Sequence, residues 1–160
     1  MAAIRPYREG DAEAIVAITL AAIRTTGLRA YSPEQVAAWS ARFSARRVLE
    51  WAGRGDVILV AVDGDNHPLA YTMFEADGHL DMLYCHPDHS GRGLALGLLE
   101  AVEAAARAQN LTRLFTEASE LARPVFERSG FAVIKRRDFA IPFEGHEVAI
   151  HNYAMEKRLD

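Results

Sequence analysis

The chain has 160 residues, of which 50% are hydrophobic and 25% are charged. This length corresponds to one domain, residues 1–160, and the hydrophobic share argues against a disordered chain, which could not offset its conformational entropy. The 18 basic and 22 acidic residues leave a net charge of −4 with histidine neutral. A dedicated nucleic-acid-binding protein would instead show a concentrated basic face.

The single cysteine, Cys85, cannot form an internal disulfide, and the common zinc sites need more cysteines or paired histidines. The N-terminal residues lack the apolar run of a signal peptide, and no stretch is long and apolar enough to span a membrane. We therefore expect a cytoplasmic protein, a monomer or a homodimer, with no metal and with neither nucleic acid nor membrane as a partner.

In chain order, a short strand at 3–6 is followed by a helix that begins at Asp11, whose carboxylate can cap the free amides. The helical pattern breaks near residue 27 and restarts with Ser32 as N-cap and Pro33 at the first helical position. A further helical stretch includes residues 48–51. The first third of the chain is therefore predicted to be mainly helical.

After Gly53 the apolar period changes, and three strands connected by short polar turns form an antiparallel meander at 57–62, 68–74 and 79–85. The remaining elements are a helix at 93–109, a strand at 113–118, a helix at 122–129 closed by Gly130, and strands at 131–141 and 147–157. This order predicts an α/β (α+β) fold with a mixed, mostly antiparallel central sheet and helices on both faces.

The strand 79–85 leads through a glycine-rich turn, Ser90-Gly91-Arg92-Gly93, directly into the following helix. The two glycines let the backbone approach a ligand closely, and the first amides of a helix have no intrahelical partner. Free amides and the positive end of the helix dipole bind anions, and Arg92 adds a full charge. A phosphate or pyrophosphate is the expected ligand.

Two common phosphate-binding motifs do not fit this turn. A dinucleotide fingerprint would need glycine where Leu96 stands, and a P-loop would need Gly-Lys-Ser or Gly-Lys-Thr, which the sequence lacks. The structural alternative is a helix start that merely contains glycine.

Residues 90–95, Ser-Gly-Arg-Gly-Leu-Ala, preceded by His-Pro-Asp at 86–88, resemble the acetyl-coenzyme A (acetyl-CoA) signature of the GNAT N-acetyltransferase superfamily, Gln/Arg-x-x-Gly-x-Gly/Ala. Residues 119–131 resemble its second signature, Asn-x-x-Ala-x-x-Phe-Tyr-Glu-Lys-x-Gly-Phe. The order of elements matches that family's fold from end to end. The segments 31–36 and 152–153 resemble a subgroup of small bacterial members.

The resemblance implies that acetyl-CoA is the co-substrate and binds between two splayed parallel strands, 79–85 and 113–118. The pantetheine arm would pair with backbone groups of one strand, and the pyrophosphate would lie on the amides of the glycine-rich turn. The implied coenzyme-binding residues are Leu83, Tyr84, Cys85, Ser90, Gly91, Arg92, Gly93, Leu94, Ala95, Ser119 and Phe126. An amine would then attack the thioester directly, without a covalent enzyme intermediate.

Three residues depart from the family pattern. Ser90 stands where Gln or Arg is usual, which removes the contacts of a longer side chain. Ser119 replaces an asparagine, although its hydroxyl can still reach pantetheine or water. Phe126 replaces the tyrosine that usually protonates the departing thiolate, and phenylalanine cannot donate a proton.

An amine such as that of lysine must lose its proton before it attacks, so a base is useful. Asp81, inside the strand beside the implied cleft, and Glu117, on the next strand, are candidate bases. For each, a solvated or hydrogen-bonded strand carboxylate is the structural alternative.

Tyr153 is the candidate replacement for the missing acid, because in the family the last strand lies beside the strand that here holds Glu117. Tyr84 is a weaker candidate. His151 shares the face of Tyr153 by strand alternation, and His151 and Tyr31 are expected to contact the acceptor. A core aromatic or a structural histidine is the alternative for these residues.

Other reactive or charged residues have structural interpretations. Cys85 beside His86 suggests a nucleophile and a base, but adjacent strand residues point to opposite faces, so a buried structural cysteine is expected. The spacing of Cys85, His86 and His89 matches no standard metal site. The basic runs 46–47 and 135–137 are solvated faces, or hold an anionic substrate or the 3′-phosphate of the coenzyme.

The sequence therefore predicts an enzyme that moves the acetyl group of acetyl-CoA to a primary amine of a small molecule or peptide. The competing interpretation, suggested by Phe126, is a GNAT-like domain that binds coenzyme A as a sensor and has lost catalysis. A partner-dependent protein acetyltransferase is a third interpretation.

Overall fold

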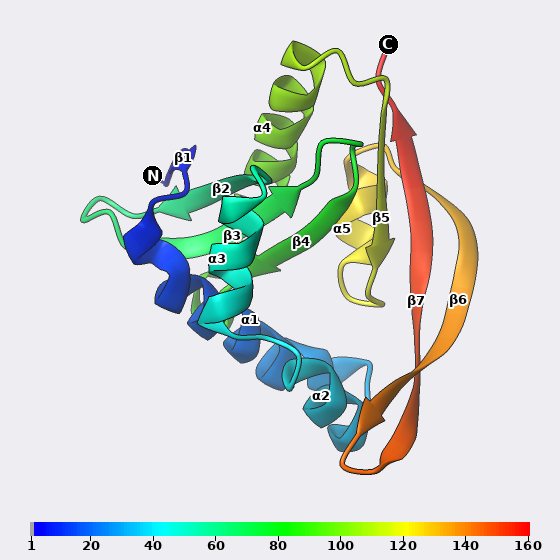
Figure 1. Cartoon of the computed structure of the whole chain (residues 1–160). Helices are drawn as coiled ribbons and strands as arrows, with labels where there is room; N and C mark the ends of the chain where they lie inside the picture. The colour runs from blue at the N-terminus through cyan, green and yellow to red at the C-terminus, as the bar shows by residue number, and fades with distance from the viewer. Residues whose placement is uncertain (1) are drawn as a thin grey trace.

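The computed structural model describes residues 2–160 (Figure 1). Its helices and strands are β1 (Ala3–Pro6), α1 (Ala12–Thr25), α2 (Pro33–Ser40), α3 (Ala45–Gly53), β2 (Val57–Val62), β3 (Pro68–Phe74), β4 (Leu80–Cys85), α4 (Leu94–Ala108), β5 (Arg113–Ala118), α5 (Arg123–Arg128), β6 (Ala132–Phe143) and β7 (His146–Arg158). Every predicted strand and helix is present, with small shifts at its ends. Within this part of the chain, no helix combines the length and the apolar run that a bilayer crossing requires.

The strands form two antiparallel sheets, which meet at one point. One sheet has the order β1-β2-β3-β4 and the other the order β5-β7-β6. A parallel bridge between His79 and Phe115 joins them, so β4 and β5 start side by side. The predicted mixed, mostly antiparallel fold with flanking helices is confirmed, and its sheet is divided between β4 and β5.

Helices cover both faces of the first sheet, and alternate residues of β2 show how. Val60 packs in the cluster that contains Ile15 of α1 and Trp51 of α3. The next residue, Ala61, packs against Leu98 of α4 instead. Because successive strand residues point to opposite faces, α1 and α3 cover one face and α4 covers the other (Figure 1).

The N-terminal helices also reach the second sheet. Ile23 of α1 and Val36 of α2 share a buried cluster with Val148 and Ile150 of β7. In Figure 1, α2 accordingly lies beside the far end of the long β6–β7 hairpin. The two sheets are therefore joined at one end by the strand junction and at the other by helix packing.

The two predicted helix caps have different outcomes. Ser32 caps α2 as predicted, since its Oγ accepts from the amide of Gln35 (3.1 Å) and the Gln35 side chain accepts from the amide of Ser32 (2.8 Å). The predicted Asp11 cap is wrong. The buried Asp11 carboxylate forms an ion pair with Arg5 (2.8 Å) and accepts from the amide of Arg8 (2.8 Å), so it faces away from the amides of α1.

Gly78 permits the junction between the sheets. Its carbonyl accepts from the amide of Phe115 (3.1 Å), and a Cβ added to Gly78 would lie 2.3 Å from the carbonyl oxygen of Arg113. Its φ of +94° is also one that side chains rarely adopt. A side chain at this position would push β5 away from the β3–β4 turn.

We predict that Gly78→Ala destabilises the protein by more than about 2 kcal/mol, because it combines a left-handed backbone with a steric clash. Gly55→Ala is the matched control: Gly55 has a φ of +83°, but no atom lies within 4 Å of its added Cβ. That variant is expected to lose only about 1 kcal/mol. Urea unfolding measures both values, and equal losses would show that close packing at the junction is unimportant.

Candidate active site

β4 and β5 separate after their junction, and a cavity of about 600 Å³ opens between them. Near the junction, the buried Thr116 hydroxyl donates to the carbonyl of Leu80 (2.7 Å), where a regular sheet would have a backbone amide. Farther along, residues 81–84 of β4 and residues 116–119 form opposite walls of the cavity. Diverging strands leave backbone groups on their facing edges available to a ligand.

The other walls come from the segment that runs from the loop before α2 into α3 and from the β6–β7 hairpin, with Tyr31, Trp39, Arg47, Arg137 and Phe139 among the lining residues. Half of the predicted site residues line this cavity: Tyr31, Asp81, Leu83, Tyr84, Glu117, Ser119, Phe126 and His151. Cys85 and Tyr153 are not part of its wall, and the turn 90–95 lies beyond the end of β4.

Asp81 occupies an irregularity in β4. Met73 of β3 pairs with Met82, whereas the next residue, Phe74, pairs with Leu80, so Asp81 is an extra residue in the ladder. Such bulges re-aim side chains and commonly occur next to active sites. Asp81 stands at this bulge, is accessible to solvent and lines the cavity between the strands.

Glu117 is paired with His79, a residue that the sequence analysis missed. His79 Nε2 lies 2.7 Å from Glu117 Oε1, and the imidazole ring stacks on Phe115 at a centroid distance of 4.9 Å. The hydrogen bond to Glu117 raises the pKa of His79 to about 9 and lowers the pKa of Glu117. At neutral pH this pair is an imidazolium and a carboxylate.

Asp81 has a different electrostatic environment. Burial in the cavity wall raises the pKa of its carboxyl group, and His79 opposes that effect. Among the ion pairs within residues 2–160, none includes Asp81. Ligand atoms of His79, Asp81 and Glu117 lie within 4.8 Å of one another, an arrangement that a divalent cation could also occupy.

The glycine-rich turn has the backbone geometry of an anion site. Gly91 and Gly93 have φ values of +77° and +76°, and Gly93 is the N-cap of α4, where no side chain caps the helix. No atom lies within 4 Å of a Cβ added to either glycine, so the space before the first amides of α4 is open. The Ser90 hydroxyl donates to the carbonyl of Pro87 (2.9 Å) and stays within the turn.

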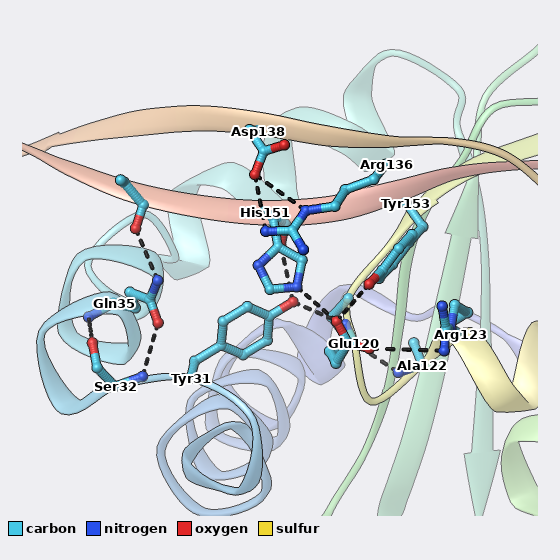
Figure 2. A network of polar contacts seen from close by, with 12 residues as sticks. Tyr31, Ser32, Gln35, Glu120, Ala122, Arg123, Arg136, Asp138, His151 and Tyr153 are labelled. Carbon is cyan, nitrogen blue, oxygen red and sulfur yellow. Dashed lines mark hydrogen bonds and ion pairs between the residues drawn. The ribbon is translucent and has the colours of Figure 1, made fainter.

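Beside the cavity, Tyr31, His151 and Tyr153 form a polar network around Glu120 (Figure 2). His151 Nε2 and the Tyr153 hydroxyl both bind Glu120 Oε2, at 2.6 and 2.8 Å. The Tyr31 hydroxyl accepts from the Glu120 amide (2.8 Å) and donates to the carbonyl of His151 (2.9 Å). The network fixes the β5–α5 loop to β7 and to the loop before α2.

Comparisons with known proteins agree with this geometry. The family model described as "Acetyltransferase (GNAT) domain" matches residues 27–156. The uncharacterised N-acetyltransferase YafP of Escherichia coli is 30% identical over 134 residues, which cover 84% of this chain and 83% of YafP.

The chain belongs to the GNAT acetyltransferase family.

Solved GNAT structures are also similar. The crystal structure of a GCN5-related N-acetyltransferase from Rhodopseudomonas palustris is 32% identical, has a TM-score of 0.85, and is matched over 99% of this chain and 96% of that one. The structure of the acetyltransferase YncA from Salmonella typhimurium with acetyl-CoA has a TM-score of 0.75 at 20% identity, over 100% of this chain and 95% of that one. At this level of identity, the similarity to YncA shows a shared fold.

The structure does not direct Tyr153 toward the GNAT cleft. Tyr153 and His151 share one face of β7, as predicted, and β7 pairs with β5. However, the Tyr153 hydroxyl donates to Glu120, and this hydrogen bond raises its pKa. The guanidinium of Arg123 lies 4.6 Å from the ring centroid on one side. In this structure the Tyr153 hydroxyl is therefore engaged with Glu120, and the role of Tyr153 as general acid stays a prediction.

Phe126, where GNAT enzymes usually have tyrosine, is largely a core residue. It is 2% exposed and packs edge-on against Phe131 at a centroid distance of 5.0 Å, with part of its ring at the cavity wall. Ser119 lies at the end of β5, and its Oγ accepts from the amide of Ala122 (3.1 Å). The Ser119 hydroxyl proton can therefore still be donated into the cavity.

The remaining candidates from the sequence are Cys85 and the two basic runs. The Cys85 thiol is half-buried, its pKa is raised by burial, and it contacts the carbonyl of His86 at 3.5 Å, so it does not form the thiolate that a nucleophile requires. The basic runs are divided: Arg47 and Arg137 line the cavity, whereas Arg46 pairs with Glu50 on the surface.

The His79–Glu117 pair should make stability depend on pH. Because the folded pKa of His79 is raised from 6.5 to about 9, its contribution is fully present below pH 6.5 and is lost as the pH rises through 9. We expect a loss on the order of 1 kcal/mol between pH 6.5 and 10, since the pair is partly solvated. NMR should show the His79 ring titrating near pH 9, and lower in Glu117→Gln. A wild-type midpoint near 6.5 would contradict the pairing.

Proposed function

We propose that the protein transfers the acetyl group of acetyl-CoA to a primary amine by direct attack in a ternary complex. The observation that carries this proposal is that β4 and β5 separate and leave a cavity between them. The glycine-rich start of α4, which no side chain caps, follows β4 in the chain, and the carboxylate of Asp81 lines the cavity without an ion-pair partner within residues 2–160. The YncA structure, which holds acetyl-CoA in the same fold, supports it.

The coenzyme would extend along the free edge of β4. The pantetheine arm would pair with backbone groups of Leu83, Tyr84 and Cys85, as a strand pairs with a sheet edge. The pyrophosphate would lie in the open space before Leu94 and Ala95, where unpartnered amides and the helix dipole favour an anion. The exposed Arg92 side chain adds a positive charge beside that position.

The acceptor amine must be neutral when it attacks. At pH 7 the removal of a proton from an amine with a pKa near 10.4 costs about 4.6 kcal/mol. Asp81 is the better of the two candidate bases, because its carboxylate is unpaired and burial raises its pKa. Glu117 is held by His79, which lowers its pKa and reduces its basicity.

In the transfer step, the amine nitrogen forms a bond to the acetyl carbon, and the carbon–sulfur bond of acetyl-CoA breaks. The acceptor loses two protons: Asp81 takes the ammonium proton before the attack, directly or through water, and releases it to solvent, and the proton of the attacking nitrogen passes to Asp81 as the new bond forms. The departing thiolate takes one proton from solvent. Ser119 lines the cavity, and its hydroxyl can donate a proton to the departing thiolate. This route does not require Tyr153 to break its hydrogen bond to Glu120.

A coenzyme A sensor without catalysis is the second candidate, and Phe126 is the observation that favours it. One measurement distinguishes the two candidate functions: the release of free thiol from acetyl-CoA in the presence of a panel of amines. Turnover with any acceptor supports the enzyme, whereas tight coenzyme binding without turnover supports the sensor.

We predict that acetyl-CoA raises the melting temperature, as any ligand specific for the folded state does, and that Gly93→Asp abolishes this shift. The aspartate would place a negative charge in the open space before α4. Gly145→Asp is the control, because Gly145 has a similar φ of +81° and equally open surroundings in the β6–β7 turn. An undiminished shift in Gly93→Asp would remove this turn from the coenzyme site.

We predict that Asp81→Asn lowers kcat by about 10²- to 10⁴-fold, the usual contribution of a general base, without weakening acetyl-CoA binding. Wild-type activity should fall at acid pH as the Asp81 carboxyl group, whose pKa is raised, takes up a proton. Glu117→Gln serves as the comparison and is expected to lose less activity. If Glu117→Gln lost more, Glu117 would be the base.

A further inference from the structure

Three arginines line the cavity: Arg42 after α2, Arg47 in α3 and Arg137 on β6. None of the ion pairs within residues 2–160 includes any of the three. Their sequence neighbours behave differently. Arg46 pairs with Glu50 (3.3 Å) and Arg136 with Asp138 (3.0 Å), both on exposed faces. Each basic run thus sends one guanidinium to the cavity and keeps the other paired on the surface.

Two of these guanidiniums are held in place by neutral groups. Arg47 donates to the carbonyl of Arg42 and lies 5.8 Å from the centroid of the Phe43 ring. Arg137 donates to Asn152 Oδ1 (3.0 Å) and lies 5.4 Å from the centroid of the Phe139 ring. These contacts orient the guanidiniums without neutralising them, so most of their donors remain available.

The charges of the cavity wall do not balance. Its carboxylates are Asp81 and Glu117, and the imidazolium of His79 contacts Glu117 at 2.7 Å and, outside the wall, Glu75 at 3.3 Å. Three guanidiniums therefore line the same wall as two carboxylates, one of which has the His79 imidazolium as a partner. A wall with this excess favours a ligand that carries negative charge, and guanidiniums suit planar oxyanions because they donate in a fork.

Between the charged groups, the wall is aromatic. Trp39 and Phe43 pack against Tyr84 at centroid distances of 6.4 and 6.0 Å, and Phe139 lines the β6 side. A ligand that fits has an amine near Asp81, an apolar body and an oxyanion within reach of the arginines.

We propose that the acceptor is an amine that also carries an oxyanion, such as the carboxylate of an amino acid, and that Arg47 and Arg137 bind this oxyanion. This inference rests on the proposed function, since it assigns the substrate class of the same cavity. It makes the pocket selective for zwitterionic acceptors over simple amines. It also assigns these arginines to the acceptor and not to the 3′-phosphate of the coenzyme.

The test compares amino acids with their carboxamides, which keep the amine and the side chain but lose the negative charge. Phenylalanine, tryptophan, methionine and glutamate are each paired with the corresponding α-carboxamide, and kcat/KM is measured by thiol release. For the accepted side chains, we expect the acid to exceed its carboxamide by at least about tenfold, as one hydrogen bond between charged groups contributes. Arg47→Gln and Arg137→Gln should reduce this ratio to about two or less.

Arg46→Gln and Arg136→Gln are the matched controls, because each removes the same charge from the neighbouring position and leaves the cavity wall intact. They should keep the wild-type ratio, and all four variants should bind acetyl-CoA as the wild type does. Carboxamides that equal or exceed the acids throughout would overturn the proposal. So would a loss of acetyl-CoA affinity in Arg47→Gln and Arg137→Gln, which would assign the arginines to the coenzyme.

Binding measurements separate this proposal from the proposed function. The phenylalanine, methionine and glutamate pairs are titrated into the coenzyme A complex, and quenching of tryptophan fluorescence reports occupancy because Trp39 lines the cavity. Absence of turnover with every amine would contradict acetyl transfer, yet preferential binding of the acids that Arg47→Gln removes would still support the oxyanion site. Equal binding of acids and carboxamides would contradict the oxyanion site, even if both were acetylated.

Discussion

The site depends on a junction between two strands that is made at one end only. The amide of Phe115 bonds to the carbonyl of Gly78, and the Thr116 hydroxyl bonds to the carbonyl of Leu80. Beyond these contacts β4 and β5 follow different sheets, and the cavity occupies the space between them. A continuous sheet would have paired these edges and left no place for a ligand. The absence of a side chain at Gly78 is what allows the junction to be so close.

Three hydrophobic clusters surround the cavity. One packs the first sheet against α1 and α3, and another packs Phe74 and Leu80 of the first sheet and Leu114 and Met155 of the second against α4 and α5. A third cluster brings α2 against the β6–β7 hairpin and closes the far side. The Glu120 network adds polar contacts at the same place, so Tyr31 and His151 are held by hydrogen bonds within the cavity wall. The cavity is therefore built into the fold.

The ionisable groups of the cavity wall differ in whether they have an ion-pair partner. Of the two carboxylates on the cavity wall, Glu117 is paired with His79, whereas Asp81, at the bulge in β4, forms no ion pair within residues 2–160 and has a raised pKa. The unpaired arginines lie on the other walls. Residues of the same type thus differ in charge environment, because some have an ion-pair partner within residues 2–160 and others have none there.

The sequence was sufficient for the order of elements, the Ser32 cap and the GNAT family, because apolar period, turn residues and glycine spacing are local signals. It was insufficient where distant segments meet. His79 pairs with Glu117 across the junction, and Glu120 gathers His151 and Tyr153 from β7, which no local pattern encodes. The Asp81 bulge depends on the register with β3. Asp11 was misjudged because Arg5, on β1, competes for its carboxylate.

The central claim is that acetyl-CoA binds along the free edge of β4 and at the start of α4. Hydrogen–deuterium exchange of backbone amides, with and without acetyl-CoA, tests it most directly. The structure predicts that the coenzyme slows exchange in residues 83–85 and 91–95, with little change in the β6–β7 turn around Gly145. Slower exchange only in other segments, or no change at saturating acetyl-CoA, would contradict the proposal that the coenzyme binds at the edge of β4 and the start of α4.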